Sequence, residues 1–137
     1  MNILVIDAQG GGIGRQVVTA VRKSLPGVTV TAVGTNSAAT AAMLKAGADE
    51  AATGENAVVV CCRNADVIVG PVGIVIADAL LGEVTPRMAL AVGQSRAKRI
   101  LIPVNHCSNI IAGVGDLSMS RLLESVMDEL RRALGRA

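Results

Sequence analysis

A cluster of glycines between an apolar run and a helical pattern is the feature that most constrains the fold of this chain. The sequence begins MNILVIDAQGGGIGRQVV, and residues 10–14 contain four glycines. The run at residues 2–6 predicts a buried strand, while Ile13, Val17 and Val21 recur at helical spacing. Clustered glycines cost conformational entropy in folding, so we expect this strand–turn–helix unit to have a use that offsets the cost.

The rest of the chain predicts an alternation of strands and helices. Further strands are predicted at residues 28–33, 49–52, 66–70 and 99–104. Further helices are predicted at residues 37–46 behind a Ser37 cap, at 57–62, at 74–81, at 86–93 behind a Thr85 cap, and at the C-terminus behind Asp116 or Ser118.

Two of these segments leave alternatives open. The stretch AVVVCC at residues 57–62 fits a strand or a buried helix, and we assign a helix because a strand–helix alternation needs one before the next strand. The stretch NIIAGV at residues 109–114 follows the fifth strand too closely for a crossover helix. It predicts either an antiparallel edge strand or an extended loop.

This alternation predicts an α/β fold. The simplest arrangement is a single Rossmann-like domain over residues 1–137, with a three-layer, doubly wound, mainly parallel sheet in the order 3-2-1-4-5. Ligands of such folds bind at the carboxyl ends of the strands, where the strand order reverses. The loops at residues 7–14 and 70–73 are expected to face each other there.

Composition supports this fold and excludes some functions. The chain is 51% hydrophobic but has no Phe, Tyr or Trp, so its core is aliphatic, as suits a parallel sheet covered on both faces. No aromatic ring is available to stack on an unpaired base, and the net charge is only +2 without a basic block. We therefore expect neither nucleic acid nor a membrane surface as a partner.

The cysteines indicate a reducing compartment. Cys61, Cys62 and Cys107 are odd in number, two of them are adjacent, and no CxxC spacing occurs. This pattern favours free thiols and a cytoplasmic location. His106 is the only histidine, so no zinc-ligand set is expected, and no metal site is predicted.

The glycine loop is a candidate phosphate site. Glycines let a phosphate approach the backbone, and the first N–H groups of a helix favour an anion. Arg15 adds a positive charge beside the loop. We expect a nucleotide-like ligand; the residues do not identify the cofactor, and NAD(P) or another nucleotide are the candidates. The candidate binding residues are Asp7, Gly10, Gly11, Gly12, Ile13, Gly14, Arg15, Thr35, Asn36, Ser37, Gly70, Pro71, Gly73 and Asn105.

The loop departs from each standard fingerprint, which keeps a plain strand–helix turn as the alternative. GxGxxG requires a third glycine where Arg15 stands, and a Walker A loop requires Gly-Lys before Ser or Thr. GGIGR resembles the end of the short-chain dehydrogenase loop, with Ala8 in the place of the first glycine. The Tyr-x-x-x-Lys pair of that family is absent, because the chain has no tyrosine.

The other candidate residues have similar alternatives. Thr35, Asn36 and Ser37 would hydrogen-bond a ribose or a 2′-phosphate, or simply form a polar turn that caps a helix. The segment VGPVG at residues 69–73 would form the opposite wall of the crevice, or only a strand-to-helix turn. Asn105 would reach into the crevice, or lie in a surface turn.

The whole chain resembles a family of short bacterial Rossmann-like proteins of unknown function. The resemblance rests on its length and on MNILVIDAQGGGIGRQ, VGPVGIVIADALLGEVTPRMA and ILIPVN. It implies a fold and no catalytic residues. A looser similarity links the N-terminal strand and turn to the nucleotide-binding domains of potassium-uptake regulators. Those domains carry an acidic residue after the second strand, which this sequence lacks.

The residues do not identify a reaction, so a second function class stays open. With one histidine, no tyrosine and no nucleophile–base pair in view, the chain fits a non-catalytic sensor or an oligomeric partner subunit. The segments at residues 73–84 and 88–93 carry more apolar residues than one helix face needs. They predict either a homodimer through these helices or full coverage of both within the monomer.

Overall fold

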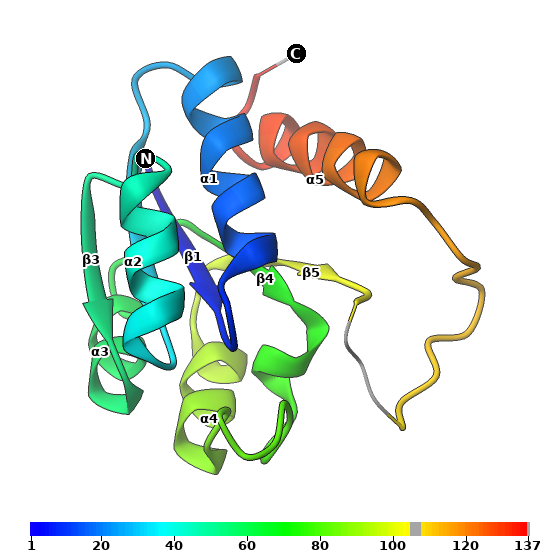
Figure 1. The fold of residues 1–137 in the computed structure, drawn as a ribbon. Coiled ribbons are helices and arrows are strands. Elements are labelled where there is room, and N and C mark those ends of the chain that lie inside the picture. The colour runs from blue at the N-terminus through cyan, green and yellow to red at the C-terminus, as the bar shows by residue number, and fades with distance from the viewer. Residues whose placement is uncertain (105–107, 137) are drawn as a thin grey trace.

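A five-stranded parallel sheet forms the centre of the protein (Figure 1). The computed structural model describes residues 1–104 and 108–136. The strand order is β3-β2-β1-β4-β5, which confirms the predicted Rossmann-like α/β fold. The strands are β1 (Asn2–Asp7), β2 (Thr29–Gly34), β3 (Glu50–Thr53), β4 (Val67–Pro71) and β5 (Lys98–Ile102).

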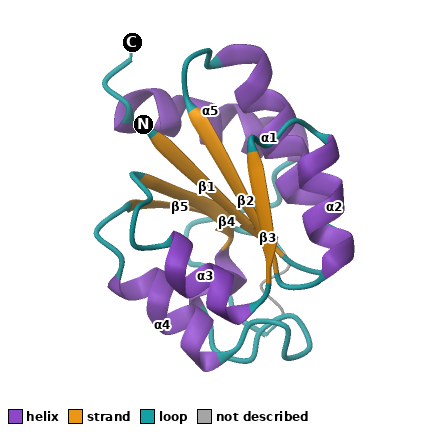
Figure 2. Ribbon diagram, turned by 90° about the vertical axis from the view of Figure 1, so that its left-hand side faces the viewer, coloured by secondary structure: helices purple, strands orange, loops and turns teal. Residues whose placement is uncertain are grey.

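Helices follow the strands and cover both faces of the sheet (Figure 2). They are α1 (Gly12–Ser24), α2 (Ser37–Lys45), α3 (Glu55–Cys61), the 3₁₀ helix η1 (Val72–Val75), α4 (Pro86–Gln94) and α5 (Met119–Ala133). The helix chosen for residues 57–62 is therefore confirmed as α3. Helices α1, α2 and α5 pack on one face, and α3, η1 and α4 pack on the other.

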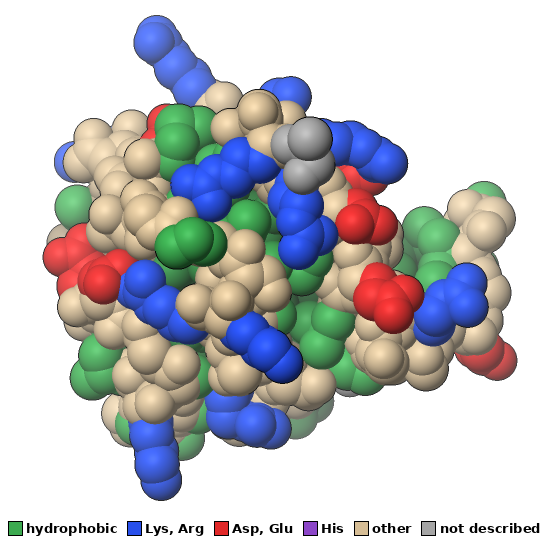
Figure 3. Space-filling model, turned by 90° about the horizontal axis from the view of Figure 1, so that it is seen from above, with side chains coloured by type: hydrophobic (Ala, Val, Ile, Leu, Met, Phe, Trp, Pro, Cys, Tyr) green, Lys and Arg blue, Asp and Glu red, His purple; other side chains and the backbone are tan. Residues whose placement is uncertain are grey.

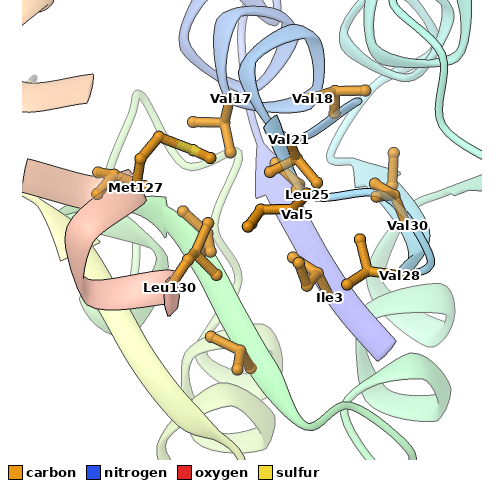
Figure 4. Packing of buried hydrophobic residues seen from close by; sticks show 14 of the residues in the cluster. Ile3, Val5, Val17, Val18, Val21, Leu25, Val28, Val30, Met127 and Leu130 are labelled. Carbon is orange, nitrogen blue, oxygen red and sulfur yellow. The ribbon is translucent and has the colours of Figure 1, made fainter. Parts of the chain in front are cut away.

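Alternation along β1 divides the core into two layers. Ile3 and Val5 face α1 and α5, whereas Leu4 and Ile6 face α3 and α4. Figure 4 shows the first layer, to which α1 contributes Val17 and Val21 and α5 contributes Met127 and Leu130. Because both faces are buried, the strand is continuously apolar in sequence. The same burial fixes the register, since a one-residue slip would exchange the two layers.

Side-chain caps set the starts of three helices. Thr85 caps α4, with its Oγ1 accepting from the N–H of Met88 at 3.1 Å, and Ser118 caps α5. Both caps lie at positions that the sequence marked. The cap of α2 is Asn36 rather than Ser37, because the Asn36 Oδ1 accepts from the N–H of Ala39 at 2.9 Å. The Ser37 prediction was therefore wrong by one residue.

The predicted helix at residues 74–81 is wrong. Only η1 forms, and a loop follows it to Thr85. Asp78, Leu80 and Leu81 have φ of 67°, 57° and 59°, which a right-handed helix cannot contain. The loop is instead anchored by the side chains of Leu80 and Val84, which are buried in the core under α4. Burial of these apolar side chains therefore outweighs the local preference for a helix.

The segment after β5 forms no further strand. Residues 108–118 are an extended loop that leads to α5 and projects from the body of the molecule (Figure 1). The loop alternative for residues 109–114 is thus the one observed.

At the edge of the sheet formed by the amino ends of the strands, Figure 3 shows many Lys and Arg side chains. The last turns of α1 and α5 supply Arg22, Lys23, Arg131 and Arg132. This charge lies away from the glycine loop.

Candidate nucleotide site

The glycine loop lies at the carboxyl end of β1, where the strand order reverses. The chain leaves β1 at Asp7, turns through Gln9 and Gly11 at φ of 53° and 71°, and enters α1 at Gly12. A hydrogen bond from the N–H of Gly11 to the carbonyl of Ala8, 3.0 Å long, closes the turn. This is the place at which an open parallel sheet binds ligands.

Two of the loop glycines are required by packing. A Cβ on Gly11 would lie 2.8 Å from the Cα of Ala39 in α2, and its φ is left-handed. A Cβ on Gly14 would lie 2.5 Å from the Sδ of Met43 and 2.9 Å from the Cβ of Asp7. Gly11 and Gly14 therefore let α1 pack closely against β1 and α2, and the fold explains them without a ligand.

The other two loop glycines are not explained by packing. Gly10 and Gly12 are exposed, neither has a positive φ, and a Cβ on either would meet no atom within 4 Å. Their backbone N–H groups donate no hydrogen bond within the described residues. The loop thus presents a bare, donor-rich backbone surface at the first turn of α1.

The Asp7 carboxylate holds the glycine loop through hydrogen bonds from the loop's backbone. Its buried carboxylate accepts from the N–H of Ala8 at 2.8 Å and from the N–H of Gly14 at 2.6 Å. Burial raises the pKa of Asp7, against the lowering effect of the backbone N–H groups of Gly14, Ala8 and Ile13. The nearby Glu83 carboxylate raises this pKa further. Because Asp7 is enclosed and hydrogen-bonded, it orients the loop and has no room to contact a substrate.

Glu83 was not among the predicted site residues, yet its carboxylate joins the glycine loop to the turn after β2 at the carboxyl ends of the strands. One carboxylate oxygen, Oε1, accepts three hydrogen bonds: from the N–H of Gln9 at 2.9 Å, from Thr35 Oγ1 at 2.7 Å and from Asn36 Nδ2 at 2.7 Å. Burial opposes ionisation of Glu83, but these three donors outweigh it and lower its pKa. Glu83 therefore carries a negative charge at the end of β2 at neutral pH.

The polar residues after β2 are therefore already engaged. Thr35 and Asn36 donate to Glu83, and Asn36 also donates to the carbonyl of Gln9 at 2.9 Å. Ser37 is exposed in the first turn of α2. The sequence placed these residues at the correct edge but missed the carboxylate that they hold.

The segment at residues 69–73, which was predicted to form the opposite wall of the crevice, is closely packed against the rest of the fold. A Cβ on Gly70 would lie 2.5 Å from the carbonyl oxygen of Ile6, so this glycine lets β4 approach β1. Pro71 and Gly73 are buried, and a Cβ on Gly73 would make ordinary van der Waals contacts with Ala79 and Leu80. The alternative of a strand-to-helix turn therefore explains this segment.

The remaining candidates differ in how far they reach the loop. Arg15 is exposed beside Gly12, and its guanidinium has no partner within the described residues. Ile13 is half-buried and packs against the core under α1. Asn105, with His106 and Cys107, lies outside the described residues. Cys61 and Cys62 are free thiols in the layer under α3, and burial raises the pKa of Cys62 to about 11.

Comparison with known proteins supplies a family. The model of the Domain of unknown function (DUF3842) matches residues 2–135. The chain belongs to this family. The DUF3842 chain is similar to a solved structure described as a dodecameric FMN-dependent Ubix-like decarboxylase from Escherichia coli O157:H7, at 20% identity and a TM-score of 0.47. The match covers 98% of this chain and 77% of the other, and concerns the fold alone. No curated protein matches the DUF3842 chain.

Over residues 1–104 and 108–136, no helix has the length and apolar character to cross a membrane. In the same residues, no group of three or more His, Cys, Asp or Glu side chains is placed to hold a metal ion.

Proposed function

We propose that this protein binds a nucleotide or dinucleotide with a phosphate group on the backbone of Gly10 and Gly12. The observation that carries the proposal is that neither packing nor a positive φ explains these two glycines. Glycine has an entropic cost in folding and is used where something must approach the backbone closely. A phosphate at the first turn of α1 would use the free N–H groups and the helix dipole.

The charges around the loop favour a ligand with few phosphate charges. Arg15 is exposed beside the loop and adds one positive charge to the partial charge of the helix. Asp7 and Glu83 place two carboxyl groups at the same edge. A triphosphate would meet more repulsion there than a monophosphate or a bridging diphosphate does. NAD and AMP are therefore better candidates than ATP.

Thermal shift tests the proposal. The panel is NAD, NADP, ATP, AMP, FMN and S-adenosylmethionine, each at millimolar concentration. A ligand present at 100 times its Kd stabilises the folded state by about 2.7 kcal/mol, which a melting curve resolves easily. We expect NAD or AMP to raise the Tm of the wild type and not that of Gly12→Val. No shift with any member of the panel would refute nucleotide binding.

The second candidate, an oligomeric subunit without its own catalysis, rests on two exposed leucines. Leu81 is 96% exposed and Leu90 is 56% exposed, and they lie in the two segments singled out from the sequence. A groove of about 400 Å³ between α3 and α4 includes Leu90, Val59 and Ala91. A symmetric dimer through α4 would cover this surface. Light scattering that gives a monomer mass at micromolar concentration would exclude it.

A further inference from the structure

The Glu83 carboxylate lies at the end of β2, where the strand and the turn that follows it contain no acidic residue of their own. Glu83 belongs to the loop between η1 and α4, yet its Oε1 contacts the glycine loop and the end of β2. The residues that hold it are separated from it by 74, 48 and 47 positions in the chain. Three donors from two other loops converge on a single oxygen.

The loop that carries Glu83 is held in a strained conformation. The N–H of Asp78 donates to the carbonyl of Val84 at 2.7 Å, and the N–H of Val84 donates to the carbonyl of Ala79 at 3.2 Å. Asp78, Leu80 and Leu81 all have positive φ. Such a backbone conformation is strained for residues other than glycine, and strain of this kind clusters where it positions a functional group. Here it fixes the two residues between Leu81 and Val84, which are Gly82 and Glu83.

The second oxygen of the carboxylate is free to accept. Within the described residues no donor contacts Glu83 Oε2, and this oxygen is not among the enclosed unpaired atoms. An ionised carboxylate accepts hydrogen bonds and donates none. The Gln9 N–H that contacts Glu83 is next to Gly10 in the chain, so Glu83 borders the proposed phosphate site.

We propose that Glu83 determines specificity by accepting a hydrogen bond from the ribose 2′-hydroxyl through Oε2. This inference rests on the proposed nucleotide site. In open α/β folds the ribose of a bound dinucleotide lies at the end of the second strand, where an acidic residue selects a free hydroxyl. In this chain that strand ends at Gly34 and Thr35 follows it, and the carboxylate arrives from the loop after η1 instead. The protein selects nucleotides with an unmodified ribose and rejects a 2′-phosphate.

Calorimetric titration at pH 7 with matched nucleotides tests the inference. The probes are AMP, 2′-deoxy-AMP and adenosine 2′,5′-bisphosphate, with NAD and NADP as the same comparison in a dinucleotide. The variants are Glu83→Gln, which keeps an oxygen for the three donors, and Gly12→Val. Glu55→Gln is the matched control, because Glu55 is a half-buried glutamate that accepts from Thr85 Oγ1 at 2.7 Å.

We expect the wild type and Glu55→Gln to bind AMP at least about tenfold more tightly than its 2′-deoxy and 2′-phosphorylated forms, as befits a hydrogen bond to a charged group. Glu83→Gln should bind AMP more weakly and lose most of both preferences. Equal preferences in the wild type and Glu83→Gln would overturn the inference, as would tighter AMP binding by Glu83→Gln, which would make the carboxylate an obstacle.

The design separates this inference from the proposed function. If AMP or NAD binds the wild type but not Gly12→Val, the phosphate site stands whatever the outcome at Glu83. If neither AMP nor NAD binds the wild type at millimolar concentration, the proposed function fails and the role of Glu83 fails with it.

Discussion

Substitution of Gly12 separates the architecture of the loop from ligand binding. Gly12 is the first residue of α1, has no positive φ, and an added Cβ meets no atom within 4 Å. Alanine in place of glycine in a helix gains at most about 1 kcal/mol. We therefore expect Gly12→Ala to leave the free energy of unfolding unchanged or to raise it by up to that amount. In a domain of this size the Tm would rise by no more than about 4 °C.

The neighbouring Gly14 supplies the contrast. A Cβ there would lie 2.5 Å from Met43 Sδ and 2.9 Å from Asp7 Cβ, so Gly14→Ala overpacks the junction of α1 and β1. Overpacking of this kind costs about 1–3 kcal/mol. Urea unfolding measures both variants, and calorimetry with NAD or AMP measures their binding. A Gly12→Ala variant that unfolds more easily would refute the view that packing leaves this position open. A Gly12→Val variant that binds like the wild type would show that the loop is only a turn.

Three further predictions concern the carboxylates and a cap. The pKa of Glu83 is lowered from its ordinary value of 4.5, so the ionised form of this side chain stabilises the fold above that pH. The stability advantage of the wild type over Glu83→Gln, measured by urea unfolding, should therefore shrink as the pH falls below about 4.5. A difference in stability that stays constant with pH would contradict this prediction. Asp7→Asn should cost about 1–3 kcal/mol in urea unfolding at pH 7, because an amide has one oxygen for the two N–H groups of Ala8 and Gly14, and unchanged stability would contradict this. Thr85→Ala should cost about 1 kcal/mol through loss of the α4 cap while Thr85→Ser retains it, and equal melting of the two variants would show that the cap contributes nothing.

The fold could be predicted because its determinants are local and repeated. The apolar run of β1 and the helical spacing after it fix the first strand and helix, and the same alternation recurs along the chain. Thr85 and Pro86 mark the start of α4 in the sequence itself. The order of the strands then follows from right-handed crossovers. The helix at residues 74–81 failed because buried Leu80 and Val84 fix a left-handed path that no local pattern signals.

The site could be predicted only in part, for a related physical reason. The sequence located the glycine loop, but it could not tell the two packing glycines, Gly11 and Gly14, from the two open ones, Gly10 and Gly12. That distinction depends on α2, which supplies Ala39 and Met43 from a later part of the chain. Contacts between distant segments leave no periodic trace in the sequence.

Asp7 and Glu83, the two carboxylates at the carboxyl ends of the strands, differ in burial and in how they use their oxygens. Asp7 is 4% exposed and spends both oxygens on backbone N–H groups, so it serves the turn. Glu83 spends one oxygen on three donors and leaves the other open. An ionised carboxylate holds these three donors more tightly than a neutral amide would, because hydrogen bonds to a charged acceptor are the stronger ones. The tie between the two loops accounts for the charge of Glu83, so the calorimetric comparison of AMP with its 2′-deoxy and 2′-phosphorylated forms is what separates a ligand role of Oε2 from this structural one.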